Sequence, residues 1–204
     1  MNEFFFTIKK MIKSKNAAQI FTVIFSPVSI ALYSTIIFSV FPPTGQKNYN
    51  IIVSIILGIF FLCIFPIIGI LYLYFKGKVD LWVSDQKTRT PLYIAAIIAY
   101  IIGAIVFHYI DYKIMFVLTI AYVSVTFVVM LTNLFTKVSS HTAGVVGPIT
   151  ALAIVYGIVV FPMFIMIPAT MWARYKLKAH DLLQLITGAL IASIITSIVY
   201  IFLL

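Results

Sequence analysis

The stretch VSSHTAGVVGPITALAIVYGIVVFPMFIMIPATMWA, residues 138–173, restricts how this chain can fold, because it contains no Asp, Glu, Lys or Arg. One α-helix over its 36 residues would be about 54 Å long. The hydrocarbon core of a bilayer is only about 30 Å thick. Gly157 and Pro162 stand near the middle of the run, and both residue types interrupt helices. We therefore expect the chain to fold back near Gly157–Pro162 and to cross a membrane twice.

The rest of the chain shows the same pattern of apolar runs. Of 204 residues, 63% are hydrophobic and 9% are charged, and the mean hydropathy is +1.16; soluble domains carry about 25% charged residues. Lipid requires backbone groups to bond internally, and continuous apolar runs favour helices over barrel strands. Each further run fits one crossing, which predicts an all-α polytopic membrane helix bundle with about seven transmembrane helices. The runs are Ala17–Gln46, Asn48–Phe75, Pro91–Ile110, Ile114–Thr136 and Leu182–Leu204.

We expect two parts in the chain. Residues 1–16 alternate Phe, Ile and Met with Lys9, Lys10, Lys13 and Lys15, a composition typical of a basic amphipathic segment at a membrane surface. Residues 17–204 are predicted to form a single transmembrane domain. Cys63 is the only cysteine, so an internal disulfide is excluded.

Positive charge is distributed unequally along the predicted topology. Seven crossings place residues 1–16, 76–90, 137–142 and 174–181 on one side, and of the 14 Lys and Arg residues only Lys47 and Lys113 lie opposite. Positive residues in short loops stay cytoplasmic. The pattern predicts a multi-pass protein of the cell membrane with these loops on the cytoplasmic face. The net charge of +9 then favours membrane lipids and an anionic substrate over nucleic acid.

One of these loops leads into a helix with Lys137-Val138-Ser139-Ser140-His141. Serine hydroxyls cap helix starts, and the free N–H groups and the dipole there favour an anion. Lys137 adds a cation and His141 a titratable donor. An ordinary capped helix at the membrane surface is the alternative.

The following loop contains Arg174, His180 and Gln184. Arg174 suits bidentate contact with phosphate oxygens. Gln184 lies one turn beyond His180, where its carbonyl oxygen can accept the Nδ1–H and leave Nε2 as a nucleophile. The alternative is a basic loop that only sets the topology.

A third loop brings Asp85 and Arg89 to the start of a helix at Pro91. Pro is favoured in the first turn of a helix, and Asp85 and Arg89 can pair at i,i+4 if this stretch is helical. A second, exposed topology-setting loop is again the alternative.

Taken together, these loops resemble the type 2 phosphatidic acid phosphatase superfamily, which includes the vanadium-dependent haloperoxidases. Its motifs are Lys-x6-Arg-Pro, Pro-Ser-Gly-His and Ser-Arg-x5-His-x3-Asp, in that order. The chain has Ala173-Arg174-x5-His180-x3-Gln184 for the third motif and Val138-Ser139-Ser140-His141 for the second. The first survives as Arg89-Thr90-Pro91, with Trp82 in the place of the Lys. The resemblance covers about residues 80–188.

The resemblance implies a membrane-embedded phosphatase-like domain that hydrolyses a lipid phosphate or a polyprenyl (di)phosphate without a metal or other cofactor. His180 would attack phosphorus and form a phospho-histidine, oriented by Gln184, and His141 would protonate the leaving group. Arg89, Arg174 and Ser139 would hold the phosphoryl oxygens. Lys137 is our candidate to replace the missing Lys.

Two alternatives remain open. The Trp82 and Gln184 departures favour a catalytically weakened member that binds or translocates phospholipid. A metal-dependent prenyl- or phosphatidyl-transferase would use Asp80 and Asp85, although carboxylates five residues apart match such paired acidic motifs poorly. Further Asp, Glu, His and Cys residues are too scattered to suggest a metal site.

Overall fold

Every regular element in the described part of the chain is a helix. The computed structural model describes residues 17–43, 50–79, 83 and 85–204. The predicted amphipathic segment of residues 1–16 lies outside this part, as do Lys47, Asp80 and Trp82. The elements are α2 (Ala17–Ile24), α3 (Pro27–Val40), α4 (Ile51–Gly58), η1 (Ile59–Ile64), α5 (Phe65–Phe75), η2 (Gln86–Thr88), α6 (Thr90–Tyr109), α7 (Lys113–Phe135), α8 (Ser140–Tyr156), η3 (Gly157–Ile165), α9 (Met166–Lys176) and α10 (Leu182–Leu203).

Prolines bend the first two membrane helices. The axes of α2 and α3 meet at 42°, where Ser26 caps α3 by accepting the Ser29 N–H at 3.1 Å and Pro27 opens the new helix. Residues Ile51–Phe75 form one helical stretch that widens into a π-turn at η1 just before Pro66. A π-turn of this kind accommodates the missing N–H and the bulky ring of a proline.

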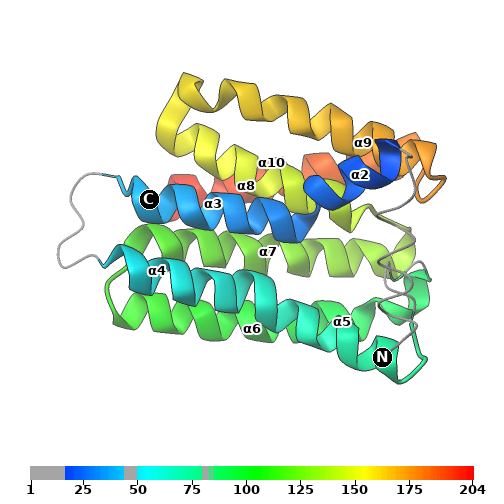
Figure 1. The fold of residues 1–204 in the computed structure, drawn as a ribbon, viewed down its shortest axis with the longest axis horizontal. Helices are drawn as coiled ribbons and strands as arrows, with labels where there is room; N and C mark the ends of the chain where they lie inside the picture. The colour runs from blue at the N-terminus through cyan, green and yellow to red at the C-terminus, as the bar shows by residue number, and fades with distance from the viewer. Residues whose placement is uncertain (1–16, 44–49, 80–82, 84) are drawn as a thin grey trace.

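The chain reverses direction at Gly157. Its φ of +64° is a left-handed conformation that favours glycine, and α9 runs back along α8 in Figure 1. The 3-10 helix η3 that follows would separate α8 from α9 by about 18 Å if it continued straight, yet α8 and α9 contact one another. The expected fold-back within residues 138–173 is therefore confirmed.

Five helices of the described chain are long and apolar enough to cross a membrane, or six if α2 and α3 form one bent span. That count takes Ser140–Lys176 as one span. The all-α membrane bundle is thus confirmed. The number of about seven requires each arm of the α8–α9 hairpin to cross separately, and it stays a prediction.

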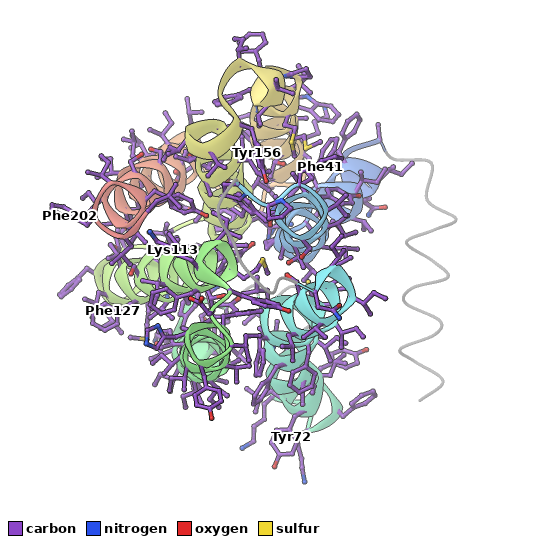
Figure 2. All side chains as sticks on the ribbon, turned by 90° about the vertical axis from the view of Figure 1, so that its left-hand side faces the viewer. Phe41, Tyr72, Lys113, Phe127, Tyr156 and Phe202 are labelled. Atoms are coloured by element: carbon purple, nitrogen blue, oxygen red, sulfur yellow. The ribbon has the colours of Figure 1, made fainter. Side chains whose placement is uncertain are left out.

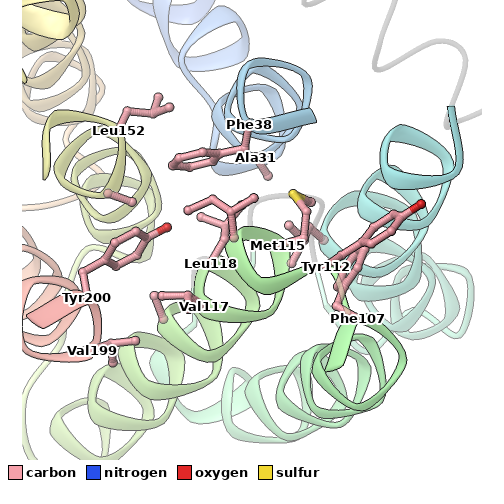
Figure 3. Close-up of a cluster of buried hydrophobic side chains, with 14 of the residues drawn as sticks. Ala31, Phe38, Phe107, Tyr112, Met115, Val117, Leu118, Leu152, Val199 and Tyr200 are labelled. Atoms are coloured by element: carbon pink, nitrogen blue, oxygen red, sulfur yellow. The ribbon is translucent and has the colours of Figure 1, made fainter. Parts of the chain in front are cut away.

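The core forms around α7. Its side chains Val117 and Leu118 lie among Phe38 of α3, Leu152 of α8 and Tyr200 of α10, as Figure 3 shows. All five side chains are at most 2% exposed. Close packing of this kind fixes the helices relative to one another.

Large apolar side chains also cover the outside. Figure 2 shows them projecting from every helix, with Tyr72, Phe127 and Phe202 among those labelled. Phe202 is 80% exposed and Phe127 is 47% exposed. Soluble monomers rarely expose continuous apolar surface on this scale, whereas lipid solvates it, so the outer face supports a membrane location.

The connections gather at two ends of the bundle. One end, called the polar end here, is formed by residues 76–79, 83, 85–89, 136–141 and 174–181. The far end is formed by residues 41–43, 50, 108–113, 157–165 and 204. Figure 1 shows both, with the polar end on the right and the C-terminus on the left. The three loops with candidate residues therefore lie on one face of the bundle.

Candidate functional site

A cavity of about 390 Å³ opens at the polar end and continues between the helices. Arg89, His141, Arg174 and His180 all line it. These residues come from three loops that are far apart in the sequence, so the structure brings four of the seven predicted site residues to one space.

Arg89 is held rigidly where α6 begins. Its Nε donates to the Val83 carbonyl oxygen at 2.9 Å, and its Nη1 donates to the Val138 carbonyl oxygen at 3.1 Å. A guanidinium has five N–H donors, so three remain after these two bonds. The side chain is 6% exposed, and it presents a fixed positive charge to the cavity. The predicted pairing with Asp85 is not seen, because the Asp85 carboxylate instead accepts the Lys87 N–H at 3.0 Å.

The loop before Arg89 is clamped to α7 by a reciprocal pair. Gln86 Nε2 donates to the Asn133 carbonyl oxygen at 2.6 Å, and Asn133 Nδ2 donates to the Gln86 carbonyl oxygen at 3.2 Å. Asn133 is 2% exposed. The clamp fixes the position from which α6, and Arg89 with it, begins.

Arg174 lies in the last turn of α9 and is 5% exposed. The helix ends directly after it in a Schellman turn, with the Ala179 N–H bonded to the Arg174 carbonyl oxygen and the Lys178 N–H to the Tyr175 carbonyl oxygen. Lys178 takes the left-handed position of this turn, with φ +53°. The turn directs the chain from Arg174 back to His180 within six residues.

A series of hydrogen bonds from Asp181 through Gln184 fixes the tautomer of His180. The Asp181 carboxylate accepts the Gln184 Nε2–H at 2.8 Å, so the Gln184 Oε1 must face His180. His180 Nδ1 lies 2.9 Å from that oxygen. Because a carbonyl oxygen only accepts, Nδ1 carries the proton and Nε2 keeps its lone pair. Gln184 thus lies where the sequence predicted, and Asp181 acts behind it without touching the imidazole.

The electrostatics of the cavity keep His180 neutral. Burial lowers the pKa of His180, the bond to Gln184 raises it, and the cations Arg89, Arg174 and Lys137 lower it, so that the pKa is about 4. His180 is therefore an uncharged imidazole at neutral pH, the form that can act as a nucleophile.

Two predicted residues support the site from outside the cavity lining. Ser139 is fully buried and caps α8, its Oγ accepting the Thr142 N–H at 3.2 Å. Lys137 Nζ donates to the Ala179 carbonyl oxygen at 3.0 Å and so joins two of the loops. Burial lowers the pKa of Lys137, Arg89 and Arg174 lower it further, and Asp181 and Asp85 raise it. In this arrangement the Lys137 ammonium is directed to the main chain of the next loop.

Among the cavity hydroxyls that the sequence interpretation missed, two form a hydrogen-bonded pair near the candidate residues. Ser140 and Tyr93 both line the cavity, with their oxygens 2.6 Å apart. Tyr93 follows Arg89 by four residues and therefore lies on the same face of α6, which is the signal that could have identified it. His141 lies next to Ser140 in the first turn of α8.

Within the described ranges, no three His, Cys, Asp or Glu side chains gather into a group that could hold a metal ion. Asp80, one of the two carboxylates of the transferase alternative, lies outside these ranges.

No protein-family model, curated protein or solved structure matches the chain. The likeness to the phosphatidic acid phosphatase superfamily therefore rests on the three motifs, and the membership stays a hypothesis.

Proposed function

We propose that the protein is a multi-pass membrane phosphatase that hydrolyses a lipid phosphate or diphosphate through a phospho-histidine, without a metal. The observation that supports it most is the shared cavity, where two buried arginines and two histidines from separate loops meet. Buried cations are costly, and an anionic ligand with several oxygens would offset that cost.

In the proposed reaction, His180 Nε2 attacks phosphorus while the bond from phosphorus to the leaving oxygen breaks. His141 gives that oxygen a proton, and the imidazolium that this step requires depends on the bound phosphate, whose negative charge offsets the charges of the two arginines. Water then attacks the phosphorus of the phospho-histidine and loses a proton to His141, and the phosphorus–nitrogen bond breaks to release phosphate and neutral His180. Arg89 and Arg174 stabilise the charge on the equatorial oxygens throughout.

The chain from Asp181 through Gln184 suits this chemistry. Phosphorylation of Nε2 while Nδ1 keeps its proton makes the imidazole cationic. Gln184 accepts the Nδ1–H, and the negative charge of the Asp181 carboxylate acts on the imidazole through the Gln184 amide, to which it is hydrogen-bonded. Position 184 has an amide where the family motif has a carboxylate, and the Asp181 carboxylate lies one hydrogen bond further from His180.

The topology of the proposal follows the charge count. Seven crossings, with both arms of the α8–α9 hairpin spanning the membrane, place the site on the cytoplasmic face. The substrate would then come from the cytoplasmic leaflet.

The test uses purified protein in vesicles with long-chain lipid phosphates, scored by phosphate release. We expect His180→Ala to abolish turnover and His141→Ala to reduce it strongly. His108→Ala is the matched control, because His108 is exposed at the far end. Wild-type rates in both site variants would contradict the mechanism.

One observation favours a second function, phospholipid binding or translocation without hydrolysis. The Lys of the first motif is replaced by Trp82, and Lys137, its candidate substitute, is bonded to a main-chain carbonyl. Binding of a phosphate lipid that depends on Arg89 and Arg174, with no phosphate released, would identify this function. Loss of activity with a chelator and in Asp85→Asn would instead point to the transferase.

A further inference from the structure

The cavity has a polar mouth and a long apolar interior. Beyond the two arginines, most of its wall residues are apolar or small, among them Ile67, Ala96, Ala121 and Ala151, and the hydroxyl side chains of Tyr100, Tyr122, Thr126 and Thr196 interrupt them. The four apolar residues come from four different helices, so the interior lies inside the bundle and not on its surface. We call this interior the chain chamber.

The chain chamber is about one leaflet deep. Lining residues extend from Arg89 to Tyr100 along α6, from Val129 to Leu118 along α7 and from Ser140 to Ala151 along α8. Each of these intervals rises about 16 Å in an α-helix, about half of the roughly 30 Å hydrocarbon core. Tyr100 and Tyr122, with ring centroids 5.3 Å apart, line its deep part.

The two helices on one side of the chamber diverge toward the polar end. Figure 1 shows α2 rising away from α5, and α2 packs on α9 whereas α5 packs on α6. The bend between α2 and α3 lies at Pro27, the π-turn of the other wall lies just before Pro66, and both prolines line the cavity. The divergence of these two walls toward the polar end provides a lateral route from the membrane into the chamber.

The chamber is small for a lipid. The whole cavity, with its polar mouth, has about 390 Å³, which is near the lower end of the roughly 300–1,000 Å³ found for sites that enclose drug-sized ligands. A phosphate group and part of one chain fill such a volume, and a second chain has no place in it.

From these features we infer that the site binds lipid phosphates by one apolar chain, which lies in the chain chamber between α3, α5, α6, α7 and α8. Single-chain lipid phosphates are accordingly preferred over two-chain phosphatidates. The inference rests on the proposed function for the identity of the phosphate group, and the chamber supplies the class of tail.

Photo-crosslinking tests the location without requiring turnover. A single-chain lipid phosphate with a diazirine midway along its chain is incorporated into phosphatidylcholine vesicles with the protein. We expect labels on the chamber side of α6 and α7, at residues such as Ala96 and Ala121. Labels confined to outward side chains such as Ile98, which is 50% exposed, would overturn the inference even if the protein hydrolyses the lipid.

A chamber-filling variant tests the selectivity. Ala96→Phe occupies the space of several methylenes, so we expect labelling and kcat/KM for the long chain to fall about tenfold or more. Hydrolysis of butyl phosphate, whose chain is much shorter, should fall far less than hydrolysis of the long-chain substrate. Ile98→Phe, two positions along the same helix and facing lipid, is the matched control, and Ala121→Val provides a milder filling if Ala96→Phe fails to fold.

The results separate the two proposals. Chamber labelling without hydrolysis of either substrate would contradict the phosphatase proposal and support the single-chain binding site. Equal losses for long and short substrates, or faster hydrolysis of phosphatidate than of its single-chain counterpart, would overturn the single-chain site and leave the phosphatase standing.

Discussion

The two ends of the bundle use similar residues for different purposes. The polar end has His180, Asp181 and Lys137, and the far end has His108, Asp111 and Lys113. His180 is 6% exposed and lines the cavity, whereas His108 is exposed and packs against the Phe116 ring at 5.3 Å.

The lysines differ in the same way. Lys113 is exposed and donates to the Leu204 carbonyl oxygen at 2.9 Å, which ties the C-terminus to α7. Lys137 joins two loops around the cavity and adds its charge to that of Arg89 and Arg174. Composition alone does not distinguish the ends. The difference is the cavity: among the described residues, cations surround a cavity at the polar end and not at the far end.

In the comparison of the two ends, the largest effect is expected from the shape of a cation at the polar end. The Arg89 guanidinium binds the Val83 and Val138 carbonyl oxygens and has further donors for the cavity. Arg89→Lys keeps the charge but loses this set of donors. We expect kcat/KM for a lipid phosphate to fall about 100-fold, as for loss of one preorganised transition-state donor. Lys113→Arg, the reverse exchange at the far end, should leave the rate unchanged, and equal rates in both variants would remove the distinction.

The pH dependence tests the neutral state of His180. Because its pKa is lowered to about 4, the neutral form is present above that pH, and the acid side of the pH profile for phospho-enzyme formation should have its midpoint near pH 4. The same shift makes the free energy of unfolding fall as pH decreases from about 6.5, the ordinary histidine value, toward 4.

Gln184→Glu should move the acid midpoint of phospho-enzyme formation. A carboxylate beside Nδ1 favours the imidazolium and raises the pKa of His180, so the midpoint should shift upward by about 1 to 3 pH units. Rapid-quench measurement of the phospho-enzyme between pH 3 and 8 gives both midpoints. Coincident midpoints in the two proteins would show that His180 does not control the step.

A smaller effect is expected from Asp181→Asn. Asn is as good a helix cap as Asp, so the start of α10 and the thermal midpoint of the protein should be preserved. The amide of Gln184 loses its charged partner, however, and its orientation toward His180 becomes less certain. We expect kcat to fall about 10- to 100-fold, by analogy with the loss of hydrogen-bond partners of metal-ligating histidines, and an unchanged kcat would confine Asp181 to capping.

Close packing at the polar end should make Gly188 irreplaceable. A Cβ at Gly188 would lie 2.6 Å from the Ser139 carbonyl oxygen, the backbone atom that accepts the Ala143 N–H in the first turn of α8. Gly188→Ala should therefore cost about 1–3 kcal/mol of stability, measured by thermal unfolding in detergent. At Gly69 the nearest atom would be 3.4 Å away, so Gly69→Ala should be neutral or stabilising.

The sequence predicted the parts of the molecule that the bilayer dictates. Charge-free runs became helices, and Gly157 reversed the longest run, because lipid leaves the backbone no other way to satisfy its hydrogen bonds. The gathering of Arg89, Arg174 and His180 at one end followed from the same crossings. The i,i+4 spacing also predicted the contact between His180 and Gln184.

Side-chain direction was less predictable. Sequence does not show that the Lys137 ammonium reaches the Ala179 carbonyl oxygen, or that Ser139 turns inward to cap α8 while Ser140 lines the cavity. These outcomes depend on how α8 and α10 dock, which long-range packing decides. The depth of the chain chamber likewise depends on bends at Pro27 and η1 whose direction the sequence leaves open.

The smallest expected effect compares two turns with the same geometry at opposite ends. Lys178 ends α9 and Asp111 ends α6, each at positive φ, +53° and +60°, in a Schellman turn. Asp tolerates this left-handed conformation better than Lys does. Lys178→Gly should therefore stabilise the protein by about 0.5–1 kcal/mol, and Asp111→Gly by less, as a difference in thermal midpoint. Since Lys178 is exposed and outside the cavity lining, a rate change in Lys178→Gly would mean that the turn between Arg174 and His180 must flex during turnover.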